Sequence, residues 1–142
     1  EVTEREVAAA LVAADGGWLV ADGEGRVLAE VDEQPTEVAL LDGVSSTAAV
    51  GEALDDEVLD ALRVAAAVPA VLADDVALVR GSGSDVELDL RQGGVVVLGG
   101  AEDAAEKLAA AAAVLGAVPP GCVDRLDVSL PAAPALVRAP GC

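Results

Sequence analysis

The sequence predicts an α+β fold in which two helices pack on a largely antiparallel β-sheet. Three observations lead to this class. The chain has 142 residues, of which 54% are hydrophobic, enough for one domain with its own core. Its apolar patterns follow the order strands, helix, strands, helix, strands. The strands after each helix arrive mostly as pairs joined by short turns, which favours antiparallel neighbours.

The first strands are separated by glycine-containing turns. Apolar runs cover residues 7–14, 18–20 and 26–29. Asp22–Gly25 joins the second run to the third, and Asp-Gly between two apolar runs is a strong hairpin signal. A further short strand is predicted at 38–41. The N-terminal part therefore supplies a hairpin and its neighbours.

Helical spacing begins near Thr47 and ends at Pro69. The apolar residues recur at intervals of four, four and three, which places them on one helix face. These residues are Leu54, Val58, Leu62 and Ala65. We expect one amphipathic helix here.

The clearest strand alternates apolar residues at 86, 88 and 90 with charged residues at 85, 87, 89 and 91. This pattern is typical of a strand with one buried and one solvated face. A strand over 76–80 precedes it, after the connection Gly81–Ser84, and Gln92–Gly94 turns the chain into a strand over 95–98. A second hairpin is therefore predicted.

A second helix is expected from about Ala101 to Leu115, with Asp103 and Lys107 paired at i, i+4 on its surface. Beyond it, apolar residues at 126, 128 and 130 alternate with polar ones, which predicts a strand. A final short apolar run covers 135–137. Leu126 and Val128 are assigned to the core.

The charge pattern excludes nucleic acid as a partner. The net charge is −18, with 18 acidic and 3 basic residues in 1–75 and 8 acidic and 5 basic residues in 76–142. Phosphate binding needs clustered Lys and Arg, and an anionic membrane surface would repel the chain. No stretch reaches the roughly 20 apolar residues that span a bilayer, so we expect no membrane contact by this segment. Interface cores are poor in charge, so the second half is the better candidate for protein binding.

The residues give catalysis no support. There is no histidine, which excludes a serine triad, an imidazole ligand and a histidine base. The acidic groups Asp55–Glu57 and Asp74–Asp75 favour solvated faces over a carboxylate-dependent hydrolase, which would need two acids converging in a pocket. We predict no enzyme, cofactor or metal. The alternative left open is a secreted acidic domain that binds calcium or a small ligand.

The two cysteines, Cys122 and Cys142, are separated by 20 positions. In an oxidising compartment they can pair, which would stabilise the fold by about 3 kcal/mol on the loop-entropy model. In a reducing compartment they remain thiols. The sequence does not decide between the two states.

Several motifs together resemble the bacterial cell-division family FtsQ (DivIB). The run Leu88–Gly99 with Glu106–Leu108 resembles the family's LxLxxGxxVxLG…K segment, and Leu126–Pro131 resembles its IDVRxP strand. Val2–Arg5 resembles the VxER junction, and Trp18–Gly25 the LvDxxG hairpin. Two departures are Val7, which follows without the usual proline, and Ser129, which replaces an arginine. The order of the motifs, rather than any single one, carries the resemblance.

This resemblance implies a single extracytoplasmic β domain over residues 1–142. Residues 1–5 would be the remnant of a junction with a POTRA domain, and 139–142 a tail. The full-length protein would be a single-pass membrane protein at the division site, and the resemblance suits an actinobacterial source. Its β domain would be a non-enzymatic divisome scaffold that binds FtsB/DivIC-type and FtsL-type proteins.

The same resemblance places the partner beside the last strand, where an added strand satisfies unpaired backbone groups. The expected partner-binding residues are Leu130 through apolar contact, Ala135, Leu136 and Val137 through main-chain pairing, and Arg138 through an acidic side chain of the partner. The opposing interpretation is a frayed tail at 135–138 or an edge blunted by Pro131 and Pro134.

Overall fold

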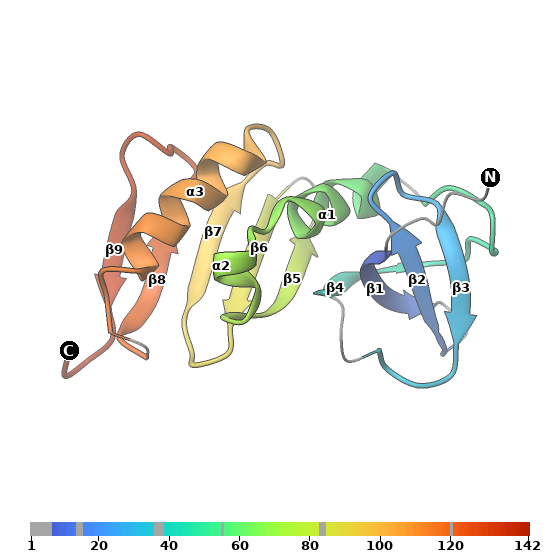
Figure 1. The fold of residues 1–142 in the computed structure, drawn as a ribbon, viewed down its shortest axis with the longest axis horizontal. Coiled ribbons are helices and arrows are strands. Elements are labelled where there is room, and N and C mark those ends of the chain that lie inside the picture. The colour runs from blue at the N-terminus through green and yellow to red at the C-terminus, as the bar shows by residue number, and fades with distance from the viewer. Residues whose placement is uncertain (1–6, 14–15, 36–38, 55, 83–84, 120) are drawn as a thin grey trace.

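The computed structural model describes residues 7–13, 16–35, 39–54, 56–82, 85–119 and 121–142. These described residues form nine strands and three helices (Figure 1). The strands are β1 (Val7–Ala13), β2 (Trp18–Asp22), β3 (Val27–Val31), β4 (Ala39–Ser46), β5 (Val76–Ser82), β6 (Asp85–Leu90), β7 (Val95–Gly99), β8 (Val123–Asp127) and β9 (Ala135–Arg138). The helices are α1 (Asp56–Ala67), α2 (Ala70–Ala73) and α3 (Ala104–Leu115).

All the strands belong to one sheet with the order β3-β2-β1-β4-β5-β6-β7-β8-β9. Chain neighbours pair antiparallel in β1–β2, β2–β3, β5–β6, β6–β7 and β8–β9. The pairs β1–β4, β4–β5 and β7–β8 are parallel. The last two parallel pairs are joined through helices, as parallel connections require. The predicted α+β class, with a largely antiparallel sheet, is confirmed.

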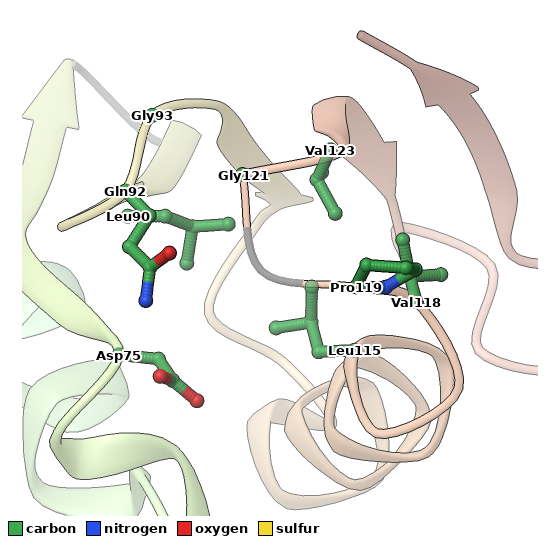
Figure 2. A pocket seen from close by; sticks show the side chains of 9 residues that line it. All are labelled: Asp75, Leu90, Gln92, Gly93, Leu115, Val118, Pro119, Gly121 and Val123. Atoms are coloured by element: carbon green, nitrogen blue, oxygen red, sulfur yellow. The ribbon is translucent and has the colours of Figure 1, made fainter. Parts of the chain in front are cut away.

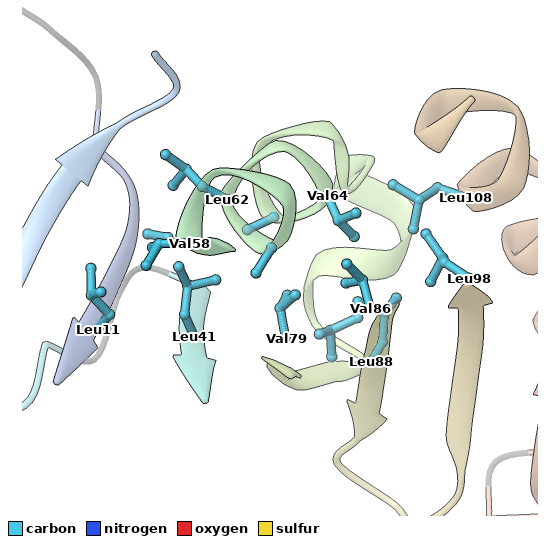
Figure 3. Close-up of a cluster of buried hydrophobic side chains, with 14 of the residues drawn as sticks. Leu11, Leu41, Val58, Leu62, Val64, Val79, Val86, Leu88, Leu98 and Leu108 are labelled. Carbon is cyan, nitrogen blue, oxygen red and sulfur yellow. The ribbon is translucent and has the colours of Figure 1, made fainter. Parts of the chain in front are cut away.

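The helices lie along one face of the sheet (Figure 1), and the main core lies between the two layers. Figure 3 shows Val58 and Val64 of α1 above strand residues such as Leu41 and Val79. Leu88 of β6 is fully buried in the same cluster. Burying a Leu or Val side chain contributes roughly 1.5–3 kcal/mol, so this aliphatic layer holds the sheet and helices together without aromatic residues.

The β6–β7 hairpin closes as predicted through the turn at 91–94. The Leu90 amide donates to the Gly94 carbonyl at 3.1 Å, and the Gly93 amide donates to the Leu90 carbonyl at 3.1 Å. Gly94 has φ of 94°, and a Cβ atom there would collide with the Val123 carbonyl oxygen of β8. Glycine is therefore required for both its conformation and its size.

The first helix begins later than predicted. Residues 47–54 do not join α1, which starts at Asp56. Instead, the Val27 amide of β3 donates to the Glu52 carbonyl at 2.9 Å, and the Gly51 amide donates to the Val27 carbonyl at 2.8 Å. The prediction of a start near Thr47 is wrong because the edge of β3 satisfies the backbone groups that a helix would otherwise pair.

Two further helix boundaries differ from the prediction. Pro69 ends α1 as expected, but it is also the N-cap of α2, a third, single-turn helix that was not predicted. The helix expected from about Ala101 starts at Ala104, with Asp103 as its N-cap at φ of 55°. Short aspartate side chains tolerate this left-handed conformation, which here turns the chain from the β7 loop into α3.

Candidate protein-binding edge

The strand β9 forms the C-terminal edge of the sheet and has β8 as its single neighbour. An edge strand of this kind presents backbone groups on its outer side. The structure brings four of the predicted partner-binding residues together on this strand: Ala135, Leu136, Val137 and Arg138. Leu136 is half-buried, whereas the other three side chains are exposed, with Val137 52% exposed.

The two faces of β9 continue two different rows of side chains. On the helix side, Leu136 lies opposite Leu126, which is fully buried in the core. On the other face, the row runs through β7, β8 and β9 as Val95, Arg125 and Val137. Because Leu136 and Val137 point to opposite faces, a strand added beside β9 would meet an apolar side chain on each face.

Leu130 lies outside the strand, in the connection between β8 and β9, and is 69% exposed. The predicted alternation through 126, 128 and 130 breaks because β8 ends at Asp127. There the carboxylate Oδ1 of Asp127 accepts hydrogen bonds from the Ser129 hydroxyl at 2.6 Å and the Ser129 amide at 2.9 Å. This local turn redirects the chain, leaving Val128 in the core and Leu130 in solvent.

The same turn sets the protonation of Asp127. The hydroxyl hydrogen bond from Ser129, followed by the amide hydrogen bond from that residue, lowers the pKa of Asp127. The positive charge of Arg125 adds a smaller contribution in the same direction. The turn beside the edge therefore keeps this carboxylate ionised to lower pH than an ordinary aspartate.

A disulfide joins Cys122 to Cys142, with their Cα atoms 5.5 Å apart. Cys122 directly precedes β8, and Cys142 is the last residue described. The Ala139 amide donates to the Cys122 carbonyl at 2.8 Å, and the Cys142 amide donates to the Ala139 carbonyl at 3.2 Å. Residues 139–142, assigned from the sequence to a tail, are thus bonded to the base of β8.

The opposite edge of the sheet, β3, is partly covered. Val27 is bonded on its outer side to residues 51 and 52, and the Leu54 amide donates to the Gly25 carbonyl at 2.7 Å. The Arg26 guanidinium also donates to the Gly51 carbonyl at 2.7 Å. The apolar spacing of this covering segment is that of a helix, so its pairing with β3 is not visible in the sequence.

Lys107 departs from its predicted place on the helix surface. Its side chain is 3% exposed, and its ammonium group donates to the Gly100 carbonyl at 3.1 Å and to the Glu102 carboxylate at 3.3 Å. The predicted ion pair with Asp103 is wrong, since the Lys107 ammonium group is bonded to Gly100 and Glu102 instead. Asp103 is joined to Lys107 through the backbone hydrogen bond of the first helical turn. Burial of the only lysine gives it a positioning role: it holds the loop between β7 and α3.

Glu102 has a lowered pKa, chiefly through a backbone hydrogen bond and then through Lys107. Its side chain is 74% exposed, so this ion pair is a weak contributor to stability. The signal that points to Lys107 in the sequence is its isolation in a helix that is otherwise rich in alanine.

A cavity of about 60 Å³ lies between the C-terminal end of α3 and the turn that follows β6 (Figure 2). Leu90, Leu115, Val118 and Val123 supply apolar walls, and Asp75 is the carboxylate among the described lining residues. A carboxylate-dependent hydrolase needs two converging acids, and this lining provides one. The cavity is suited to an apolar group rather than to acid–base chemistry.

The acidic groups singled out in the sequence do not meet in the described structure. Asp74 and Asp75 are both exposed at the turn into β5, and the side chains of Asp55–Glu57 lie outside the described residues. Within the described ranges, no group of three or more Cys, Asp or Glu residues is placed to hold a metal ion. In the same ranges, no helix is long and apolar enough to cross a bilayer.

Comparison of the sequence with known proteins finds two similar cell-division proteins. No family model matches the chain. The cell-division protein FtsQ of Streptomyces griseus is 36% identical over 139 residues, covering 96% of this chain and 65% of that protein. The chain is thus similar to FtsQ (DivIB) proteins along nearly its whole length. FtsQ of Streptomyces collinus is 34% identical over 142 residues, covering 95% of this chain and 53% of that protein.

The recognition of an actinobacterial FtsQ from ordered motifs is thereby confirmed. The chain spans between about half and two thirds of the length of these FtsQ relatives. The sheet with its helix-covered face is compatible with an FtsQ β domain. The predicted junction with a POTRA domain, at residues 1–5, lies outside the described residues.

Proposed function

We propose that this FtsQ-family chain is a single, non-enzymatic scaffold domain of the divisome, working at the extracytoplasmic face of the membrane during septum formation. Its partners would be FtsB/DivIC-type and FtsL-type proteins, bound by strand addition along β9. Family membership supports the role in cell division. The exposed position of β9 at the end of the sheet is the observation that supports this site.

The physical argument rests on unpaired backbone groups. In a strand, successive N–H groups point to opposite sides, so about half of those in β9 face away from β8. A partner strand would satisfy them, while Leu136 and Val137 offer apolar contact on the two faces. Arg138 is exposed at the end of the strand and would meet an acidic side chain at the rim.

Leu130 is expected to contribute less to partner binding than β9 does. It is exposed in the connection beside β9 rather than on the strand. It would therefore add apolar contact at one end of an added strand without pairing through its backbone. Substitution of Leu130 should weaken binding less than disruption of β9 itself.

The proposal is tested by calorimetric titration with the extracytoplasmic segment of an FtsB-type protein. Leu136→Pro and Val137→Pro remove neighbouring backbone donors, of which one faces β8 and the other faces outward. We expect the parent to bind. The proline variant whose missing N–H group would face away from β8 should lose at least about tenfold in affinity, or about 1.4 kcal/mol. Its melting temperature should be preserved. Leu136→Ala retains the donor and serves as the matched control for the side chain.

Two results would contradict the proposal. If both proline variants bind as tightly as the parent, the partner sits elsewhere on the domain. If the parent itself does not bind the FtsB-type segment, the partner assignment fails, whatever the variants do.

A further inference from the structure

The disulfide between Cys122 and Cys142 closes the open end of the β8–β9 hairpin. The last pair of this hairpin is Val123 with Arg138, and the disulfide lies directly beyond it. The hydrogen bond from the Ala139 amide to the Cys122 carbonyl lies between the two. The covalent ring formed in this way encloses both strands and the turn that joins them.

Apart from this bond, little holds β9 to the molecule. The strand has four residues and a single neighbour, and only Leu136 is half-buried, while the other side chains are exposed. The buried core cluster extends from Ala9 to Val128 and takes no fully buried residue from β9. Short edge strands with one neighbour and few buried side chains open easily unless they are tied down.

We infer that the Cys122–Cys142 disulfide is a clamp that keeps β9 paired with β8 and thereby holds the partner-binding edge in its binding conformation. The consequence for partner binding rests on the proposed function, whereas the clamping of β9 does not depend on that function. A partner strand that adds to an already ordered edge does not have to order β9 at the moment of binding, which favours affinity. Opening the disulfide would loosen the edge and leave the core intact.

The chemistry of opening is thiol–disulfide exchange with a dithiol. One thiolate of the dithiol attacks a sulfur of the Cys122–Cys142 bond, and its second thiolate then resolves the mixed disulfide. The protein gains two electrons and two protons as two cysteine thiols, and the dithiol becomes a cyclic disulfide. Dithiothreitol is a suitable reagent of this class.

Hydrogen exchange at single amides tests the clamp without any partner. In the double variant Cys122→Ser/Cys142→Ser, we expect the Ala139 amide to exchange at least about tenfold faster than in the parent. The Val128 amide, which donates to the Val97 carbonyl at 2.8 Å, is the internal control and should exchange much more slowly than the Ala139 amide in both proteins. Dithiothreitol should reproduce the change in the parent and have no effect on the variant.

The same proteins are then titrated with the FtsB-type segment. We expect the double variant to bind about tenfold more weakly than the parent, with the loss reproduced in the reduced parent. Equal exchange at Ala139 in the parent and the variant would overturn the clamp, whatever the binding result. Faster exchange with unchanged binding would overturn its role in recognition.

A parent that does not bind the segment would count against the proposed function alone. In that case the exchange rates still decide whether the disulfide clamps β9. Equal exchange rates at Ala139 and Val128 in the variant would show that β9 opens only when the whole fold opens, which would also overturn the specific role given to the bond here.

Discussion

The two edges of the sheet, β3 and β9, are protected in different ways. Val27, the first residue of β3, is bonded on its outer side to residues 51 and 52, and the charged Glu30 lies near the other end of the strand. β9 is tied only at its end, by the Cys122–Cys142 bond and the adjacent hydrogen bond, and exposes Val137. An edge strand that another segment covers resists pairing with other chains, and an edge that is not covered remains open to it.

This difference indicates that the molecule partly covers one edge with its own chain and leaves the other available. The covering segment belongs to the half with 18 acidic residues, whereas β9 belongs to the half with 8. The partner-binding role proposed for β9 fits the less charged half. The experiments below change one edge at a time and compare the result with the other.

The largest effect is expected from Leu54→Ala. Leu54 is 4% exposed and anchors the covering segment in the core. Its truncation should lower the free energy of unfolding by about 2–4 kcal/mol, because it removes buried methyl groups and leaves a cavity. Urea unfolding measures the change, and sedimentation velocity shows whether the uncovered β3 then pairs with a second molecule.

Val50→Ala is the matched control for that experiment. Val50 belongs to the same segment but is 57% exposed, so its truncation should change the free energy of unfolding by less than about 0.5 kcal/mol. Equal losses for the two variants would mean that Leu54 does not anchor the segment.

The next largest loss of stability is expected when a glycine near one of the two edges is replaced by alanine. Gly25 has φ of 89°, and a Cβ there would collide with the Leu59 side chain, so Gly25→Ala should cost about 2–3 kcal/mol of stability. Gly141, beside Cys142, has φ of 86° but open space around it. Gly141→Ala should therefore cost only the conformational penalty of about 1 kcal/mol. Thermal unfolding of both variants checks the order, and a larger loss at Gly141 would refute it.

The smallest effect is a pH dependence at the turn beside β9. Because its folded pKa is lowered, Asp127 contributes stability above its unfolded pKa of about 3.9, and this is lost as the pH falls through the folded value. Ser129→Ala removes the largest cause of the shift, so the pKa of Asp127 should rise towards its ordinary value. The accompanying loss of stability at neutral pH should be at most about 0.5 kcal/mol, since the site is well solvated.

Carbon-detected NMR titration of the Asp127 carboxyl group follows this change. Ser129→Thr retains the hydroxyl and should leave the titration close to that of the parent. If Ser129→Ala leaves the pKa of Asp127 unchanged, the hydroxyl hydrogen bond does not control the carboxylate.

Local patterns predicted most of the elements. The alternation at 85–90 and the glycines at 93 and 94 predicted the β6–β7 hairpin, because side-chain period and turn chemistry are properties of a few adjacent residues. The failures occurred where distant residues compete for the same backbone groups. Residues 51–54 have helical spacing, yet they bond to β3, which is more than 20 positions away in the chain.

Some features of the candidate site were likewise predicted from local patterns, and others depend on distant contacts. The sequence placed a final short apolar run at 135–137, and the structure has a strand over Ala135–Arg138 at the edge of the sheet. It did not predict that Leu130 would leave the strand, because the turn depends on the hydrogen bonds between Ser129 and Asp127. Nor did it predict the burial of Lys107, whose partners lie in the preceding loop.

The sequence by itself determined the family, the α+β class, the aliphatic core and the absence of histidine chemistry. These properties follow from composition, from the period of the apolar residues and from motifs in a given order. Only the tertiary structure decided which edge of the sheet is covered, that Cys142 is bonded to Cys122, and that Leu136 and Val137 lie on opposite faces of an outermost strand. Strand order and edge exposure depend on pairing between residues far apart in the chain, which no local pattern specifies.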